Sequence, residues 1–387
     1  MSVFDDLVGQ EPAVRELRSA AASAAEVLRG GSGAGMTHAW LFTGPPGSGR
    51  SVAARAFAAA LQCPDLGCGE CDACRHVLAG THADVEVVRP SGLSYGVKDS
   101  RDLVLRAGSR PSGGRWQVVC FEDADRATEQ AANVLLKAIE EPAPRTVWLL
   151  CAPSPEDLVL TIRSRCRLVT LRTPPSAAVA EVLVRRDGID TDMAAFAARA
   201  AQGHIGRARR LATDAEARRR REEVLRIPLS LDGIGACLSA AAQLVEAAEG
   251  ETNAAAGELD AAETAELRRA LGEREGGKGL PRGSAAVLRD LEERQKSRTT
   301  RMRRDALDRA LLDLASFYRD VLIVQAGSGI DLANADKEEE IRGVASGAAP
   351  ETTLRRLEAI MECRERLEAN ANPLLAVEAM TVSLQFH

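Results

Sequence analysis

The glycine-rich segment GPPGSGRS at residues 44–51 constrains the fold of this chain more than any other part of its sequence. A short apolar run, AWLF at 39–42, precedes it, and an alanine-rich stretch at 52–62 follows it. Glycines let backbone N–H groups turn toward a phosphate, and the N-terminus of a following helix adds a favourable dipole. The order therefore predicts a strand, a phosphate-binding loop and a helix. The residues expected to line the nucleotide site are Gly44, Gly47, Ser48, Gly49, Arg50 and Ser51.

One position of this segment departs from the usual pattern G-x-x-x-x-G-K-[ST]. Arg50 stands where a lysine normally reaches the β- and γ-phosphates, whereas Ser51 is placed to hold Mg²⁺. A guanidinium is wider than an ammonium and planar, so the exchange is not conservative at a site shaped for lysine. Arg50 therefore argues against catalysis, while nucleotide binding stays open.

Apolar runs of strand length alternate with helical patterns through the first part of the chain. Such alternation predicts a parallel sheet covered by helices on both faces. Helices are expected at 98–107, 128–141 and 155–163, and after the prolines at 174–175 the pattern becomes almost entirely helical. The expected strands are 39–42, 84–88, 116–121, 147–152 and 167–171.

Charge and hydropathy exclude two classes of protein. The 387 residues carry a formal net charge of −6, which argues against a globally basic DNA-coating protein. No apolar run approaches the roughly 18 residues of a membrane span, and acids near the N-terminus do not fit a secretory signal, so we expect a cytoplasmic protein. The stretch 246–306 is rich in Glu, Arg, Gly and Ala, which predicts a partly mobile insertion or an exposed charged helix.

Two acids follow the apolar run of VVCFEDAD at 118–125. In nucleotide-hydrolysing proteins such a strand delivers one carboxylate to Mg²⁺ and a second to polarise the attacking water. The usual order is Asp then Glu, but here Glu122 comes before Asp123. The second side chain is one methylene short, which sets back a general base, and proton transfer tolerates such displacement poorly.

Four of the nine cysteines, Cys63, Cys68, Cys71 and Cys74, lie within twelve residues. In a reducing compartment this cluster indicates a metal site, because paired Cys-x2-Cys turns present thiolates to one centre and four of them complete a tetrahedral Zn²⁺ site. Such a zinc ion would be structural. An iron–sulfur cluster is the alternative, but its run would place a further Cys at position 78, which is Leu.

Several arginines are candidates for contacts with phosphate. Arg165, in TIRSRC at 161–166, lies between a predicted helix and a predicted strand and could project into a neighbour's phosphate site. The arginines of GHIGRARRL at 203–211 and the runs at 218–221 and 298–304 are as compatible with a solvated basic face as with nucleotide or DNA contacts.

Together these features resemble the bacterial clamp-loader branch of the AAA+ ATPases. The resemblance is carried by five segments in the family's order: VGQ at 8–10, residues 38–51, the four cysteines, NVLLKAIEEP at 133–142 and TIRSRC. It implies an α/β AAA+ nucleotide-binding domain at 1–173 with an inserted zinc module at 63–74, a small helical lid domain at 174–226, and an all-α C-terminal collar domain at 227–387 that holds the charged insertion. It also adds Val8 to the expected nucleotide-binding residues.

In this family, motor subunits hydrolyse ATP, and a stator subunit offers the arginine of its SRC motif to the neighbouring motor. The resemblance implies that Arg165 is this arginine. The departures at Arg50 and at Glu122-Asp123 favour the stator. So do Ala152-Pro153, where a polar sensor is expected, and Gly206, where a second sensor arginine is expected. The expected partners are motor subunits, a clamp-opening subunit, the sliding clamp and primed DNA, with no membrane. Two alternatives stay open: an active motor ATPase, and a zinc-module DNA-binding protein.

Overall fold

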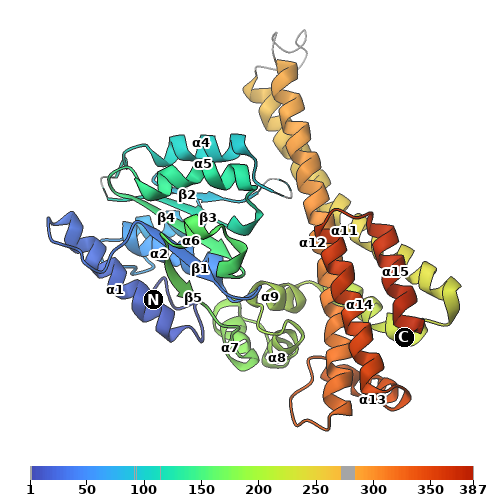
Figure 1. The fold of residues 1–387 in the computed structure, drawn as a ribbon. Coiled ribbons are helices and arrows are strands. Elements are labelled where there is room, and N and C mark those ends of the chain that lie inside the picture. The colour runs from blue at the N-terminus through green and yellow to red at the C-terminus, as the bar shows by residue number, and fades with distance from the viewer. Residues whose placement is uncertain (1, 91, 93, 114, 272–283, 387) are drawn as a thin grey trace. The chain divides into compact units, whose positions relative to one another are not determined.

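The computed structural model describes residues 2–90, 92, 94–113, 115–271 and 284–386, and it divides into two compact units, residues 1–213 and 214–387 (Figure 1). The division falls inside the helical segment predicted at 174–226. The three-domain boundaries of the sequence analysis therefore stay a prediction. No helix among the described residues is long and apolar enough to span a membrane.

The first unit is built on a parallel sheet of five strands in the order β2-β3-β4-β1-β5, as the alternating pattern predicts. Every residue of β1, β3 and β4 is buried, which explains why these strands appear in the sequence as continuous apolar runs. Because all strands run the same way, their carboxyl ends share one edge of the sheet and their amino ends the other. The strands are β1 (Ala39–Thr43), β2 (Val85–Val88), β3 (Gln117–Phe121), β4 (Thr146–Ala152) and β5 (Arg167–Thr170).

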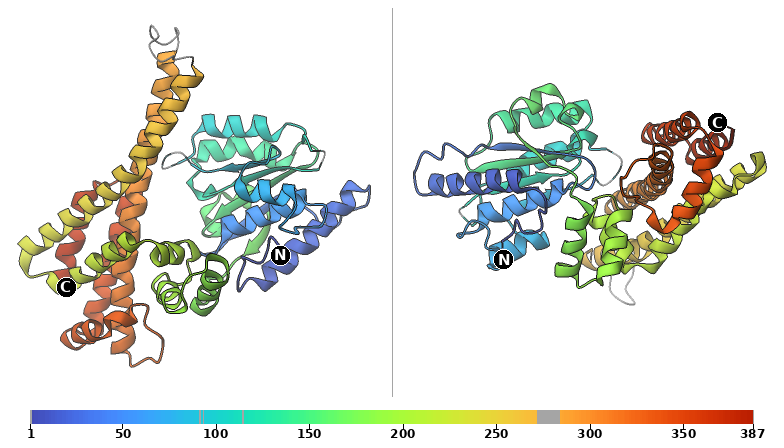
Figure 2. Two further views of the ribbon diagram at one scale, coloured as in Figure 1. Left: turned by 180° about the vertical axis from the view of Figure 1, so that it is seen from behind. Right: turned by 90° about the horizontal axis from the view of Figure 1, so that it is seen from below.

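Helices cover both faces of this sheet (Figure 1, Figure 2). Alternate residues of β1 point to opposite sides, so Trp40 joins the apolar cluster under α2 while Leu41 joins the cluster under α5. Small residues dominate the first cluster. In it, the rings of Trp40 and Phe57 pack edge to face, with their centroids 5.0 Å apart. The helices are α1 (Glu11–Leu28), α2 (Arg50–Gln62) and α3 (Asp72–Ala79) on one face, and α4 (Val97–Ala107), α5 (Glu129–Glu140) and α6 (Leu160–Arg163) on the other.

The prediction of a single helix at 155–163 is wrong. The segment forms a 3-10 turn at Pro155–Asp157 and then only the four residues of α6. Leu158 and Val159, with ψ of 148° and 135°, are extended and separate the two pieces. Other 3-10 turns lie at Ala124–Arg126 and Ala335–Lys337.

Three short helices complete the first unit: α7 (Ser176–Asp187), α8 (Thr191–Ala200) and α9 (Ile205–Thr213). The segment that leads into these helices is connected to the glycine-rich loop by hydrogen bonds from the buried side chain of Gln10. Its side-chain amide donates to the carbonyls of Ser48 at 3.3 Å and Arg172 at 2.5 Å, and its oxygen accepts from the Arg172 amide at 3.0 Å.

In the described residues of the second unit, all regular secondary structure is helical. Its core is apolar, and a buried polar network lies beside it, in which Arg221 donates to Asp313 at 3.0 Å and Asp320 accepts from the Asn334 backbone at 2.7 Å. Pro373 opens the last helix, as its position predicts. The helices are α10 (Ala215–Ser230), α11 (Gly233–Ala270), α12 (Ser284–Gln325), α13 (Glu338–Gly347), α14 (Pro350–Glu368) and α15 (Pro373–Phe386).

The charged stretch at 246–306 continues α11 and α12 as a helical hairpin, with residues 272–283 outside the described part of the chain (Figure 1). Of the two expectations for this stretch, the exposed charged helix describes these residues. Ion pairs join the two helices: Arg298 lies 2.7 Å from Glu263, and Arg303 lies 2.8 Å from Glu249.

Candidate functional site

The glycine-rich loop connects β1 to α2 at the carboxyl edge of the sheet. Its backbone adopts conformations that require glycine, with φ of +146° at Gly44 and +87° at Gly47. A side chain at Gly44 would also collide with the carbonyl oxygen of Leu171, only 2.4 Å from the ideal Cβ position. The loop therefore has the strand–loop–helix setting that the sequence predicts for a phosphate cradle.

A cavity of about 360 Å³ opens beside this loop. It brings together most of the residues expected to bind nucleotide, Gly44 not being among its lining residues. The lining includes Val8, Gly47, Ser48, Gly49, Arg50 and Ser51, together with Gln10, His204, Arg186 and Arg209.

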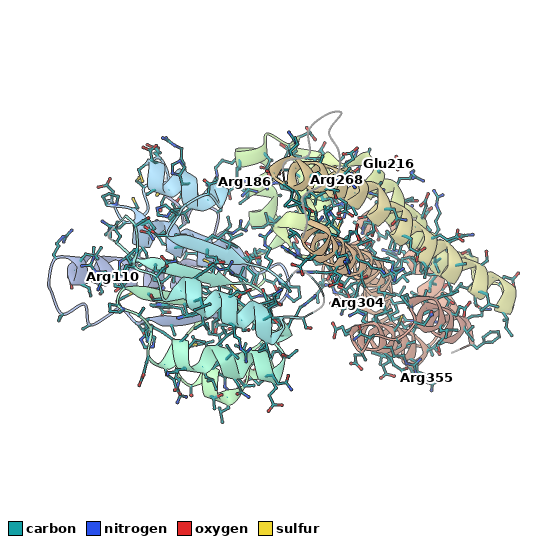
Figure 3. The ribbon with its side chains drawn as sticks, turned by 90° about the horizontal axis from the view of Figure 1, so that it is seen from above. Arg110, Arg186, Glu216, Arg268, Arg304 and Arg355 are labelled. Atoms are coloured by element: carbon teal, nitrogen blue, oxygen red, sulfur yellow. The ribbon has the colours of Figure 1, made fainter. Side chains whose placement is uncertain are left out.

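The arginines brought to this cavity by the short helices are ion-paired. Arg186, labelled in Figure 3, lies 2.8 Å from Asp6, and Arg209 lies 2.8 Å from Asp187. Gly206, which stands where the family has a sensor arginine, lines the cavity with no side chain. The cavity thus offers less free positive charge than its arginines suggest.

Arg50 turns back onto the loop that precedes it. Its guanidinium donates a hydrogen bond to the carbonyl of Gly44. Arg50 is also the first residue of α2, where a cation meets the positive end of the helix dipole. A lysine ammonium in a phosphate-binding loop points at the ligand, whereas this guanidinium binds the protein backbone.

His204, the residue before α9, packs against the same loop. A Cβ at Gly47 would lie 2.6 Å from the His204 side chain, which shows how closely the two residues approach. Burial lowers the pKa of His204, and the charges of Arg207 and Arg50 lower it further. The imidazole is therefore neutral at pH 7 and covers part of the cradle.

Glu122, the first of the two acids after β3, is held by a residue that the sequence analysis missed. The buried carboxylate of Glu122 accepts a hydrogen bond from Arg89 Nε at 2.7 Å, and Arg55 lies 3.9 Å away. Arg89 directly follows β2, the neighbour of β3 in the sheet, so the strand order could have indicated it. Asp123 has a left-handed backbone with φ of +50°. The expected Mg²⁺ and water-polarising roles of the two acids stay predictions.

The end of β4 also lacks a polar group toward the loop. Ala152 is the last residue of the strand, and the next residue, Pro153, accepts a backbone hydrogen bond from Gly44 at 3.0 Å. A side chain that senses a γ-phosphate is expected in this place. The described contact instead fastens the loop to the neighbouring strand.

The four clustered cysteines converge on one point at the end of α2. Their sulfur atoms all lie within 4.8 Å of one another, with Cys63 3.6 Å from Cys68 and 3.7 Å from Cys71. Zinc–sulfur bonds of about 2.3 Å in a tetrahedron place sulfurs about 3.8 Å apart. The geometry therefore fits a four-thiolate metal site.

The surroundings of the sulfurs support thiolates. The backbone amides of Asp65 and Cys68 donate to Cys63 at 3.3 and 3.4 Å, and the amide of Cys74 donates to Cys71 at 3.4 Å. Burial acts in the opposite direction: it raises the pKa of Cys71 and of Cys74 and so disfavours their thiolates unless a cation is bound. Four thiolates this close need a cation to offset their charge, and a Zn²⁺ ion bound by Cys63, Cys68, Cys71 and Cys74 would supply it.

Arg165 lies at the opposite edge of the sheet from the cavity. The chain crosses the sheet between the carboxyl end of β4 and the amino end of β5, and Arg165 lies two residues before β5. Its guanidinium lies 2.5 Å from Glu140 and donates to the carbonyl of Thr161 at 2.8 Å. Its side chain is 39% exposed. Arg165 is therefore remote from this chain's own cradle and accessible from outside.

The arginine runs that the sequence analysis left open are largely engaged within the protein. In the run at 218–221, Arg219 pairs with Glu216 at 2.7 Å, and Arg221 pairs with buried Asp313. In the run at 298–304, Arg298 pairs with Glu263, and Arg304, labelled in Figure 3, donates to Asn370 at 2.8 Å. These pairs favour a structural role over phosphate binding.

Two family models match the chain. One, described as DNA polymerase III, delta subunit, matches residues 28–175, and the other, described as DNA polymerase III, delta subunit, C terminal, matches residues 303–384. The first match spans the glycine-rich loop, the cysteine cluster and Arg165, and the second falls in the helical unit.

Curated relatives agree with these models. The delta′ subunit of DNA polymerase III from Pseudomonas aeruginosa is 40% identical over 161 residues, which cover 40% of this chain and 49% of that protein. The Escherichia coli delta′ subunit is 34% identical over 44% of this chain and 53% of its own length. The Bacillus subtilis tau subunit is 31% identical over 46% of this chain and 30% of its own length. The chain thus spans about half or less of the length of these relatives.

Solved structures resemble the chain more distantly. A RuvB variant from Thermotoga maritima is 20% identical over 58% of this chain and 65% of that chain, with a TM-score of 0.40. A DNA polymerase III gamma subunit-related protein from the same organism is 15% identical over 95% of this chain and 98% of that chain, with a TM-score of 0.38.

Proposed function

The chain belongs to the clamp-loader AAA+ family of DNA polymerase III subunits, and we propose that within this family it acts as a delta-prime-like stator. In this role it assembles with motor subunits into a hetero-oligomeric ring and does not itself hydrolyse ATP. It offers Arg165 as an arginine finger to the ATP bound by the adjacent motor. The ring loads the sliding clamp onto primed DNA during replication.

The observation that carries this proposal is the ion pair between Glu122 and Arg89. A carboxylate that serves Mg²⁺ or the attacking water has to face the nucleotide. Here the buried carboxylate of Glu122 is held by a guanidinium of its own chain. Arg50, Ala152 and Gly206 add three further weakened positions at the same edge of the sheet.

The implied partners follow from this role. Gamma- or tau-like motor subunits would receive Arg165, and a delta-like subunit would open the clamp. The cysteine cluster would hold a structural Zn²⁺, whose full ligation by protein leaves no position for substrate. Calorimetric titration of the chain with Mg²⁺–ATP determines whether the cavity binds nucleotide without hydrolysing it. We place the complex in the cytoplasm.

The alternative function is that of an active gamma- or tau-like motor ATPase. Two observations favour it: the chain is 31% identical to a tau subunit over 180 residues, and the loop retains its glycine backbone with Ser51 at the start of α2. A motor also needs a free acid pair and a sensor, and the contacts of Glu122 and the apolar end of β4 argue against both.

The test is a comparison of the purified chain with the reconstituted complex. The chain alone should show no appreciable ATP turnover, and calorimetric titration with Mg²⁺–ATP should reveal whether it binds nucleotide at all. In the complex, Arg165→Ala should lower DNA- and clamp-stimulated ATPase by about 10-fold or more while the ring still assembles, because an arginine finger stabilises transition-state charge. Brisk turnover by the chain alone that Ser51→Ala abolishes would refute the stator and support the motor.

A further inference from the structure

Arg165 is held in one orientation by three acceptors from two separate segments of the chain. Its terminal nitrogens donate to the carbonyl of Thr161 at 2.8 Å and to the hydroxyl of Ser164 at 3.1 Å, and they lie 2.5 Å from the carboxylate of Glu140. The first two acceptors belong to α6 and its end, beside Arg165 in the sequence. Glu140 comes from α5 and is the only one of the three that is charged.

The position of Glu140 is locally unfavourable. It is the last residue of α5, where the negative end of the helix dipole disfavours an acid. Glu141 follows it at the C-cap, so two acids end the helix. Neighbouring like charges and the dipole both destabilise this arrangement, and the ion pair with Arg165 offsets part of that cost. Local helix chemistry therefore does not explain why an acid stands here.

The contacts of Arg165 leave part of its guanidinium available. A guanidinium has five N–H groups. The contacts with Thr161, Ser164 and Glu140 occupy three of them among the described residues. Both side chains of the pair are accessible, with 39% of Arg165 and 41% of Glu140 exposed. An incoming phosphate can thus bind the remaining N–H groups without breaking the contacts behind them.

We propose that Glu140 is a positioning residue for Arg165, holding the guanidinium at the amino edge of the sheet in the orientation from which it meets the neighbouring subunit's triphosphate. The inference rests on the proposed function of Arg165. An arginine side chain has many rotamers, and fixing one before the partner arrives lowers the entropy cost of reaching the transition state. Glu140 itself touches neither ATP nor the reacting atoms.

The test measures steady-state ATPase of the reconstituted complex with primed DNA and clamp, with variants made in this chain only. Glu140→Ala should lower kcat about 3- to 10-fold and leave the KM for ATP unchanged, because positioning acts in the transition state. Glu140→Gln keeps an oxygen acceptor and should recover part of kcat. It also serves if the alanine variant fails to assemble. Glu141→Gln is the matched control, because it removes the neighbouring charge and should leave kcat unchanged.

Arg165→Ala separates the two proposals. If it lowers kcat, adding Glu140→Ala to it should have no further effect, because the residue being positioned is gone. A Glu140→Ala variant with unchanged or raised kcat overturns the inference alone, as does a further loss in the double variant. If Arg165→Ala leaves kcat unchanged in an assembled ring, the arginine finger and its positioning residue both fail.

Discussion

The two edges of the sheet in the first unit use the same residue types in opposite ways. At the carboxyl edge, the guanidiniums of Arg50 and Arg89 bind acceptors of their own chain, Gly44 and Glu122. At the amino edge, Arg165 is held by its chain yet keeps N–H groups and exposed surface for something else. The cysteine cluster also belongs to this edge, since Arg115, two residues before β3, donates to the carbonyl of Cys63 at 3.2 Å. This difference agrees with the proposed stator, which needs no free acid at the carboxyl edge and an accessible arginine at the amino edge.

The largest effect is expected from removing a metal ligand at the amino edge. Cys68→Ser should reduce bound zinc from one ion per chain to near zero and loosen the segment from Cys63 to α3, because the free energy of binding a structural zinc ion, on the order of 10 kcal/mol, also stabilises the local fold. Elemental analysis and hydrogen exchange of that segment measure the two effects.

The matched control is Cys363→Ala, which changes a buried thiol of the second unit and should retain zinc in full. Iron in place of zinc would assign the cluster differently. A Cys68→Ser protein that keeps its metal would mean that the four sulfurs do not form one site.

A smaller effect is expected at the carboxyl edge. Arg89→Ala leaves the buried Glu122 carboxylate without its closest partner and should lower the free energy of unfolding by about 1–3 kcal/mol. Urea denaturation measures this change. In a Glu122→Gln background, Arg89→Ala should lower the free energy of unfolding by less, because no buried charge is then left without its partner. Equal costs in the two backgrounds would show that the pair does not fasten this edge.

The smallest effect concerns pH. Burial lowers the pKa of His204 below its usual value of 6.5, and the nearby charges of Arg207 and Arg50 lower it further. The unfolded chain therefore binds this proton more readily than the folded one, so stability is full above pH 6.5 and falls as the pH drops toward the folded pKa. His204→Gln should flatten the fall in thermal stability below pH 6.5. His82, whose pKa is also lowered by burial, supplies a remaining slope.

Contacts between neighbours in sequence were predictable, and contacts across the fold were not. The five strands, the cysteine cluster and the helix start at Pro373 follow from local runs and spacings. The pairing of Glu122 with Arg89 needs the strand order, and the packing of His204 on Gly47 needs the placement of α9. Neither leaves a local signal. The hairpin of α11 and α12 was ambiguous because Glu, Arg and Ala suit both mobile chain and helix, and inter-helix pairs such as Arg298 with Glu263 accompany the helical outcome.

The hydrogen bonds of Gln10 restrain the movement of the small helices α7, α8 and α9 relative to the sheet. The buried amide of Gln10 makes hydrogen bonds to Ser48 and to both backbone groups of Arg172. Moving the small helices away from the sheet together with Arg172 would break the two hydrogen bonds between Gln10 and Arg172 and leave buried polar groups without partners. A subunit that changes conformation in each cycle of ATP hydrolysis needs a flexible connection at this position. In this chain, the hydrogen bonds of Gln10 restrain that connection.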